Sequence, residues 1–115
     1  MRPALGVVPA LAVWLATISH ANAARLDGNT LLEICERDRA ACMLFVIGAV
    51  DAAEVTLETL GRRQIACPAA NVTNAQLAEV VLSYLLDHPE IRHLSAASTA
   101  LAGIGTAFPC PAISN

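Results

Sequence analysis

Hydrophobic residues recur at helical spacing over four stretches of this chain. The first stretch predicts a short helix from Leu26 to Glu36, which Asp27 or Asn29 can cap. The second predicts a longer helix from Ala40 to Leu60, and Gly61 just beyond it suits the left-handed residue that ends many helices. The core-facing positions of this second helix recur at spacings of three, four and seven: Met43, Ile47, Val50, Leu57 and Leu60.

The third helix is predicted from Asn74 to Leu86, because Thr73 with Gln76 three residues later forms a capping-box pattern. It must end near Asp87, since Pro89 disfavours helical geometry at His88. Pro89 then suits the first position of a fourth helix. The core-facing positions of that helix would be Ile91, Leu94, Ala97, Leu101 and Ile104.

No stretch shows strand alternation with hairpin turns, so the predicted class is all-α, a compact four-helix domain. Gly48 lies inside the second helix, where glycine costs about 1 kcal/mol relative to alanine. We expect it to permit close approach by another backbone. Asp51 lies one turn later. It could contact a ligand or partner, but a carboxylate that faces solvent is the simpler interpretation.

Residues 1–23 have the pattern of a cleaved secretory signal peptide. Arg2 supplies the positive start, Leu5 to Ile18 form an apolar core, and Ala21-Asn22-Ala23 is an A-x-A cleavage motif. A membrane anchor is the alternative, but it needs about 20 apolar residues. We therefore expect an exported mature domain of residues 24–115 that is not held in a membrane.

All four cysteines lie in this predicted mature domain, at Cys35, Cys42, Cys67 and Cys110. An even number in a short exported chain predicts disulfides rather than a metal site, and no Cys-x-x-Cys spacing is present. Three pairings are possible. On one unbroken helix Cys35 and Cys42 would be roughly 10 Å apart, too far for a bridge, so their pairing requires a bend within residues 36–39. We favour Cys35–Cys42 with Cys67–Cys110.

Charge and composition exclude several classes of function. Without the leader the chain has six arginines and no lysine against ten acidic residues, and its only aromatic residues are Phe45, Tyr84 and Phe108. A mildly acidic chain with so little stacking surface is a poor candidate for nucleic-acid binding. His88 or His93 could act as a general base, yet no Ser or Cys nucleophile lies in a recognisable setting. We expect no enzymatic activity, no metal and no cofactor.

Five short blocks stand in a fixed order with the four cysteines: Phe45 to Ala52, Cys67-Pro68 with Val72 to Leu77, Tyr84 to Glu90, Ala100-Leu101, and Ala107-Phe108-Pro109-Cys110. This order of motifs resembles the Tai/Rap family of periplasmic immunity proteins, which neutralise type VI secretion amidase effectors. The similarity spans nearly the whole predicted mature domain. Phe45 stands where tyrosine is usual, and Ala69-Ala70-Asn71 replaces a segment that usually has proline and glycine.

The resemblance implies a helical periplasmic protein, often a homodimer, that binds and blocks a peptidoglycan amidase. A periplasmic helical chaperone or stress protein without a toxin partner is the alternative. The motif residues themselves are expected to maintain the fold. Contacts with the effector are expected from exposed charges and from one turn: Glu54, Glu58, Arg62, Arg63, Asp87, His88 and Glu90.

Overall fold

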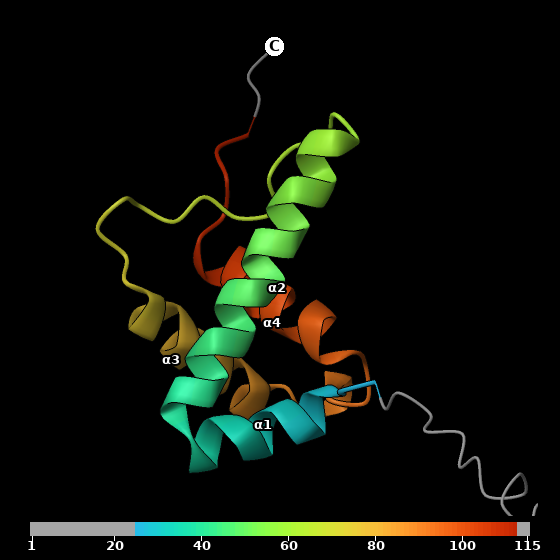
Figure 1. The fold of residues 1–115 in the computed structure, drawn as a ribbon, viewed down its shortest axis with the longest axis vertical. Coiled ribbons are helices and arrows are strands. Elements are labelled where there is room, and N and C mark those ends of the chain that lie inside the picture. The colour runs from blue at the N-terminus through green and yellow to red at the C-terminus, as the bar shows by residue number, and fades with distance from the viewer. Residues whose placement is uncertain (1–24, 113–115) are drawn as a thin grey trace, which may run out of the picture.

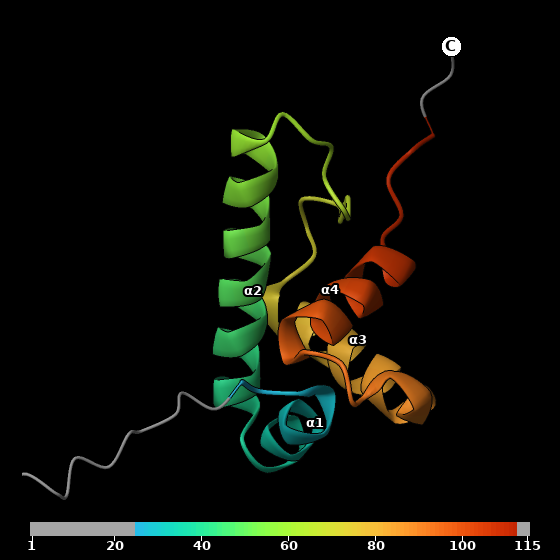
Figure 2. The same ribbon diagram turned by 90° about the vertical axis from the view of Figure 1, so that its right-hand side faces the viewer.

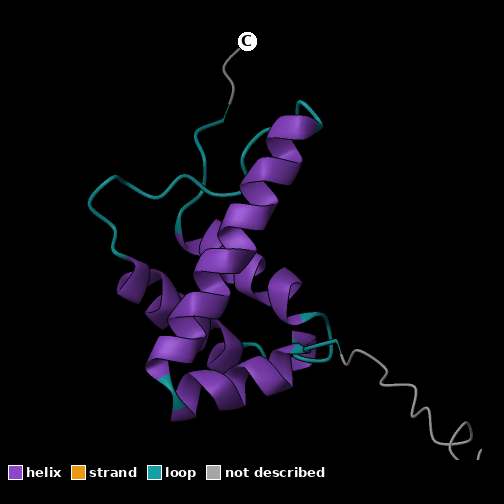
Figure 3. Ribbon diagram, in the orientation of Figure 1, coloured by secondary structure: helices purple, strands orange, loops and turns teal. Residues whose placement is uncertain are grey.

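A computed structural model describes residues 25–112, and these form four α-helices and one short 3-10 helix. The long helix α2 (Arg39–Thr59) runs along one side of the molecule, α1 (Gly28–Arg37) crosses its base, and α3 (Asn74–Asp87) and α4 (Ala96–Ala107) pack against it (Figures 1 and 2). No strand is present in the described part of the chain (Figure 3). The all-α prediction is confirmed, whereas the predicted leader lies outside the described residues.

Side-chain caps set the beginnings of the helices. Asp27 caps α1 by accepting a hydrogen bond of 2.8 Å from the Thr30 N–H, and the bonds from Thr30 lower the pKa of this carboxyl. Asp38 caps α2 in the same way. The predicted capping box of α3 is confirmed, because Thr73 Oγ1 accepts from the Gln76 N–H and Gln76 Oε1 accepts from the Thr73 N–H.

The corner between α1 and α2 is closed by a disulfide between Cys35 and Cys42. The chain leaves helical geometry only at Asp38, with φ −141° and ψ 100°. That single extended residue brings the two Cα atoms to 4.6 Å, so the predicted bend and pairing are both confirmed. Both cysteines are fully buried, which makes this bridge part of the hydrophobic core.

The core lies where α1, α3 and α4 meet one side of α2. Thr99 is the one buried polar residue in the described chain, and its hydroxyl donates to the Ala96 carbonyl at 2.9 Å, so its hydrogen-bonding need is met. The other buried positions are Gly28, Gly103 and these apolar residues: Leu31, Leu32, Cys35, Cys42, Val46, Leu77, Ala78, Val81, Leu85, Ala96, Ala100 and Ile104.

The predicted start of the fourth helix is wrong. Pro89–Ile91 form a single 3-10 turn, and α4 begins at Ala96 with Ser95 as its cap. The intervening residues instead pair with the start of α1: the Gly28 N–H donates to the Leu94 carbonyl at 3.0 Å, and the Ala96 N–H donates to the Leu26 carbonyl at 2.9 Å.

The later start also changes which side of α4 is buried. Leu94, predicted to face the core, is 45% exposed, and Ala97 is exposed as well. Ile91 and Leu101 are half-buried, so Ile104 is the predicted position that is fully buried. The buried side consists mostly of small residues: Ala96, Thr99, Ala100, Gly103 and Ile104.

The predicted glycine ending of α2 is confirmed, whereas the predicted core-facing positions of this helix are only partly buried. Gly61 has φ +63°, and Arg62 N–H donates to the Leu57 carbonyl at 2.8 Å, which completes a Schellman ending. The predicted core positions are half-buried except Leu60, which is 65% exposed. Only Cys42 and Val46 of this helix are fully buried.

The expected role of Gly48 is also wrong, because an added Cβ there would meet no other atom within 4 Å. Close approach occurs at Gly28, where an added Cβ would lie 2.9 Å from the Arg92 Cα and carbonyl oxygen. It occurs again at Gly103, where the Cβ would lie 2.9 Å from the Tyr84 Cβ. These two glycines let α1 and α4 pack tightly on their neighbours.

The second disulfide attaches the connection between α2 and α3 to the C-terminal segment. Cys67 and Cys110 pair with a Cα–Cα distance of 4.8 Å, as predicted. The Cys67 N–H also donates to the Phe108 carbonyl at 2.9 Å. The longest connection of the described chain is therefore held at its middle by one covalent bond and one backbone hydrogen bond.

Substituting alanine for glycine should have opposite effects at two helix positions. Gly28→Ala should lower the free energy of unfolding by about 1–3 kcal/mol, because its Cβ would overlap the backbone of Arg92. Gly48→Ala should raise it by up to about 1 kcal/mol through helix propensity alone. Urea unfolding of both variants tests this, and equal effects would contradict the placement of α1 against Arg92.

Removing the Cys67–Cys110 bridge by Cys67→Ala with Cys110→Ala should lower the free energy of unfolding by about 4 kcal/mol. The reason is that the unfolded chain regains the freedom of a loop with a sequence separation of 43 residues. Thermal and urea unfolding of the variant and the oxidised parent measure the loss. An unchanged free energy of unfolding would show that the bridge constrains little in the unfolded chain.

Candidate partner-binding surface

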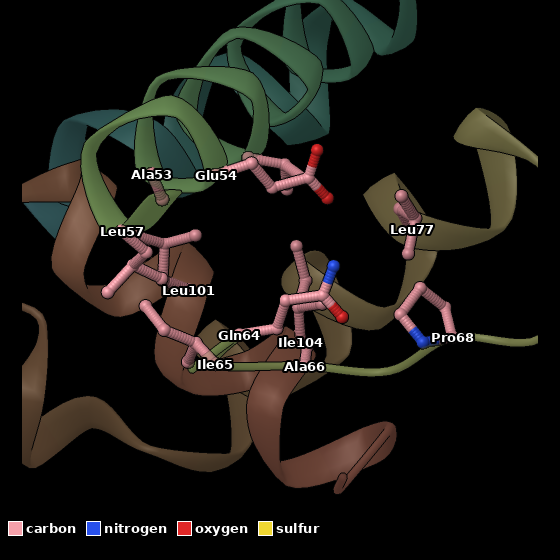
Figure 4. A pocket seen from close by; sticks show the side chains of 11 residues that line it. Ala53, Glu54, Leu57, Gln64, Ile65, Ala66, Pro68, Leu77, Leu101 and Ile104 are labelled. Atoms are coloured by element: carbon pink, nitrogen blue, oxygen red, sulfur yellow. The ribbon is translucent and has the colours of Figure 1, made fainter. Parts of the chain in front are cut away.

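A small apolar hollow lies between the C-terminal half of α2, the following connection, and helices α3 and α4. Its walls are mainly aliphatic, and its volume is about 40 Å³. Its polar groups are the Glu54 carboxylate and the Gln64 amide, which point into the same space opposite Leu77 and Pro68 (Figure 4). The aliphatic walls come from four segments of the chain: Leu57, Ile65, Leu77, Leu101 and Ile104.

A second hollow of about 190 Å³ continues the first toward the start of α3. The two share Val50, Glu54 and Leu77, so they form one groove along α2. Asp51 and Glu54 place two carboxylates along its α2 side, and no arginine or histidine lines either hollow. We call this feature the acidic groove; the second hollow adds Ile47, Asp51 and Asn74 to its lining.

Of the charged residues predicted near the end of α2, the structure places Glu54 in the acidic groove. Glu58 is exposed but lines neither hollow. Arg62 and Arg63 border a different hollow of about 280 Å³ beside the Cys67–Cys110 bridge. Arg63 Nη2 donates to the Pro111 carbonyl at 3.1 Å, so this side chain is partly engaged within the chain.

The predicted turn residues lie elsewhere. The His88 ring packs on Tyr84 with centroids 4.2 Å apart, and His88 Nδ1 lies 2.9 Å from Glu90 Oε1. The pKa of Glu90 is lowered, first by its own backbone N–H and then by the hydrogen bond from His88. Asp87 and His88 also border an open hollow of about 310 Å³ between α3 and α4.

The seven predicted contact residues therefore do not form a single site. The turn at Pro89–Ile91 follows α3 and lies beside the start of α1, whereas the end of α2 lies at the opposite end of the molecule (Figures 1 and 2). Glu54, Glu58, Arg62 and Arg63 belong to the α2 end. Asp87, His88 and Glu90 belong to the other.

The sequence did not reveal the groove, because its helical aliphatic walls were assigned to the core and Ile65 to a connecting loop. Val50, Leu57 and Ile104 do sit on predicted core faces, but the helices diverge enough to leave space between them. The one available signal was the close spacing of acidic and apolar residues along α2, from Ile47 to Glu58. Nothing in the sequence indicated that Gln64 and Ile65 would close the other side.

Within residues 25–112, no group of three or more His, Cys, Asp or Glu side chains is placed to hold a metal ion. All four cysteines are committed to bridges. What the described surface offers is a groove with aliphatic walls and two carboxylates, a pair of arginines beside a disulfide, and a turn ordered by an imidazole–carboxylate contact.

Comparison with known proteins agrees with the resemblance that the motifs carry. Searches among curated proteins and among solved structures found no match. The sequence model for the family described as Rap1a immunity proteins matches residues 27–110, which span everything from the cap of α1 to the last cysteine. A match over that much of the chain shows that this protein belongs to the Rap1a immunity protein family.

Proposed function

We propose that this protein is a periplasmic immunity protein that binds and inhibits a peptidoglycan amidase effector of type VI secretion. The observation that carries the proposal is the family match over residues 27–110. Immunity proteins act by binding a cognate effector, and the proposed role requires no chemistry from the chain itself. The family assignment gives the immunity role; we propose in addition that the target is an amidase and that the protein acts in the periplasm.

The proposed location rests on the leader and the disulfides together. Residues 1–23 carry the export pattern described above, and removing them would leave the domain of residues 24–115. Both disulfides join residues within this domain, and such bridges persist in oxidising compartments such as the bacterial periplasm. An amidase that cleaves peptidoglycan acts in the same compartment, so inhibitor and target would meet there.

The proposed mode of inhibition is obstruction by a rigid surface. The end of α2 and the connection after it present the acidic groove and the arginine pair within a segment held by the Cys67–Cys110 bridge. A preorganised surface loses little conformational freedom on binding, which favours affinity. We propose contacts there through Glu54, Glu58, Arg62 and Arg63, and a separate contact at the turn through Asp87, His88 and Glu90.

We further propose that the protein is a homodimer joined through the outer face of α2. This helix has 21 residues and is long and apolar enough to cross a membrane by length and composition, yet most of it is not buried. Large exposed apolar surface of this kind often marks an interface with another protein. Leu44 is 67% exposed and Val55 is 58% exposed, and helical spacing places both on the side away from the core, with Asp51 between them at the edge of the acidic groove. We place the second copy over Leu44 and Val55, with the groove side of α2 left open.

Immunity is tested by protection. The full chain is expressed in bacteria that also produce, in the periplasm, one of a panel of type VI amidase effectors. It should restore growth against at least one of them, and the purified domain should stop that amidase from cleaving peptidoglycan when present in equal amount.

The control for this experiment is the chain without residues 1–23, which should remain in the cytoplasm and give no protection. Failure to protect against every amidase, together with failure to capture one from periplasmic extract, would overturn the proposal. Exposure of apolar surface near pH 3 with chaperone activity would instead support the alternative of an acid-activated chaperone.

The dimer is tested by sedimentation of residues 24–115 across micromolar concentrations. The parent should sediment as a dimer, and Leu44→Glu with Val55→Glu should give a folded monomer, because two charges would be buried in an apolar interface. Leu86→Glu is the matched control, since Leu86 is 54% exposed on α3 and not on this stripe. A monomeric parent, or a parent that floats with lipid vesicles through this face, would contradict the proposal.

A further inference from the structure

The acidic groove has the form of a binding site for an extended or helical peptide segment. Its floor is aliphatic and continuous, because Val50 and Leu77 line both hollows. Val50 and Leu57 are only half-buried, so part of their apolar surface faces the groove rather than the core. An aliphatic side chain entering there would remove apolar surface from water on both partners, which favours binding.

The charged residues that line the groove are both acidic. Asp51 and Glu54 are three residues apart on α2, which places them on neighbouring positions of one side of the helix. The ion pairs of the described chain are Arg37 with Glu33, Arg39 with Glu79 and His88 with Glu90, so neither groove carboxylate is neutralised from within residues 25–112. The opposite wall contributes the neutral amides of Gln64 and Asn74.

An anionic ligand would be repelled by these carboxylates, and a purely apolar segment would leave them beside an apolar partner without compensation. A cationic side chain on an aliphatic stem satisfies both features of the groove. Arginine and lysine can lay their methylene groups along an apolar surface while the charged end reaches a carboxylate. An arginine can also donate in two directions, which suits carboxylates on successive turns of a helix.

We propose that the acidic groove binds a segment of the amidase effector in which one arginine or lysine is flanked by aliphatic residues. The cationic group lies against Asp51 and Glu54, and a neighbouring aliphatic side chain enters the hollow walled by Leu57 and Leu77. This assignment rests on the proposed immunity function, and it names the groove as the part of the surface that selects the partner. Asp51 thereby gains a role in recognition.

The first experiment uses a short probe rather than the effector. N-acetyl-Leu-Arg-Leu-amide is titrated into the isotope-labelled domain of residues 24–115 while the methyl signals of Val50, Leu57 and Leu77 are followed by NMR. These signals should shift in a saturable manner, and the Leu-Gln-Leu analogue should bind about tenfold more weakly, the ratio expected for one charge-assisted hydrogen bond.

Variants of the two groove carboxylates test whether these residues bind the peptide's arginine. Asp51→Asn with Glu54→Gln should weaken the arginine peptide about tenfold and leave the glutamine peptide unchanged. Glu36→Gln removes the same charge from an exposed position on α1 outside the groove and should change neither. Equal binding of the two peptides, absence of shifts at the groove methyls, or an equal effect of Glu36→Gln would overturn the proposal. Groove shifts that depend on protein concentration without peptide would also overturn it, because they would assign the groove to a second copy.

The same variants separate this inference from the proposed function. In the protection assay, the Asp51→Asn, Glu54→Gln chain should protect poorly against the amidase that the parent neutralises, while Glu36→Gln, at an exposed position of α1 outside the proposed contacts, should protect fully. Full protection by the double variant would overturn the groove assignment and leave immunity standing. No protection by the parent would overturn immunity, and the peptide titration would still decide whether the groove binds a basic segment.

Discussion

The backbone contact between the start of α1 and the segment before α4 is the constraint on which the rest of the structure depends. The N–H groups of Gly28 and Asn29 donate to carbonyls at Leu94 and Arg92, and the Ala96 N–H donates back to Leu26. This contact holds the segment after Pro89–Ile91 against α1 and out of the helix, so α4 begins only at Ala96. It also decides which side of α4 packs inward, and it is possible because residue 28 has no Cβ.

The small residues of α4 limit how much apolar surface of α2 the core can cover. Because its buried side is mostly alanine, glycine and threonine, α4 lies close to α3, with Gly103 against Tyr84. The core is therefore compact but thin, and α2 has more apolar surface than this core can cover. The excess appears in two places on the same helix: the outer stripe with Leu44 and Val55, and the acidic groove beside Asp51 and Glu54. The proposed immunity function needs such surfaces, since an immunity protein acts by binding its effector.

The family motifs and the proposed contact surface overlap in part. The cysteines close the two bridges, Thr73 and Gln76 cap α3, and Phe108 accepts a backbone bond from Cys67. These residues make the fold and explain why the motif order identifies the family. Other motif residues belong to the proposed surface as well: Val50, Asp51, Pro68 and Leu77 line the groove, and Asp87, His88 and Glu90 form the proposed turn contact. The departures from the usual pattern, at Phe45 and within residues 69–71, lie outside the groove lining.

The sequence alone determined the features that depend on local chemistry. Helix caps at Asp27 and Thr73, the glycine ending of α2 and the bend that allows the Cys35–Cys42 bridge all follow from residues within a few positions of each other. Only the tertiary structure decided the start of α4, the close approach at Gly28 and the division of the predicted contact residues between two ends of the molecule. Each of these depends on segments more than sixty residues apart or on the angles between helices, and periodicity along one helix carries no information about either. The groove belongs to this second group, because an apolar periodic face predicts burial and cannot show where neighbouring helices fail to meet.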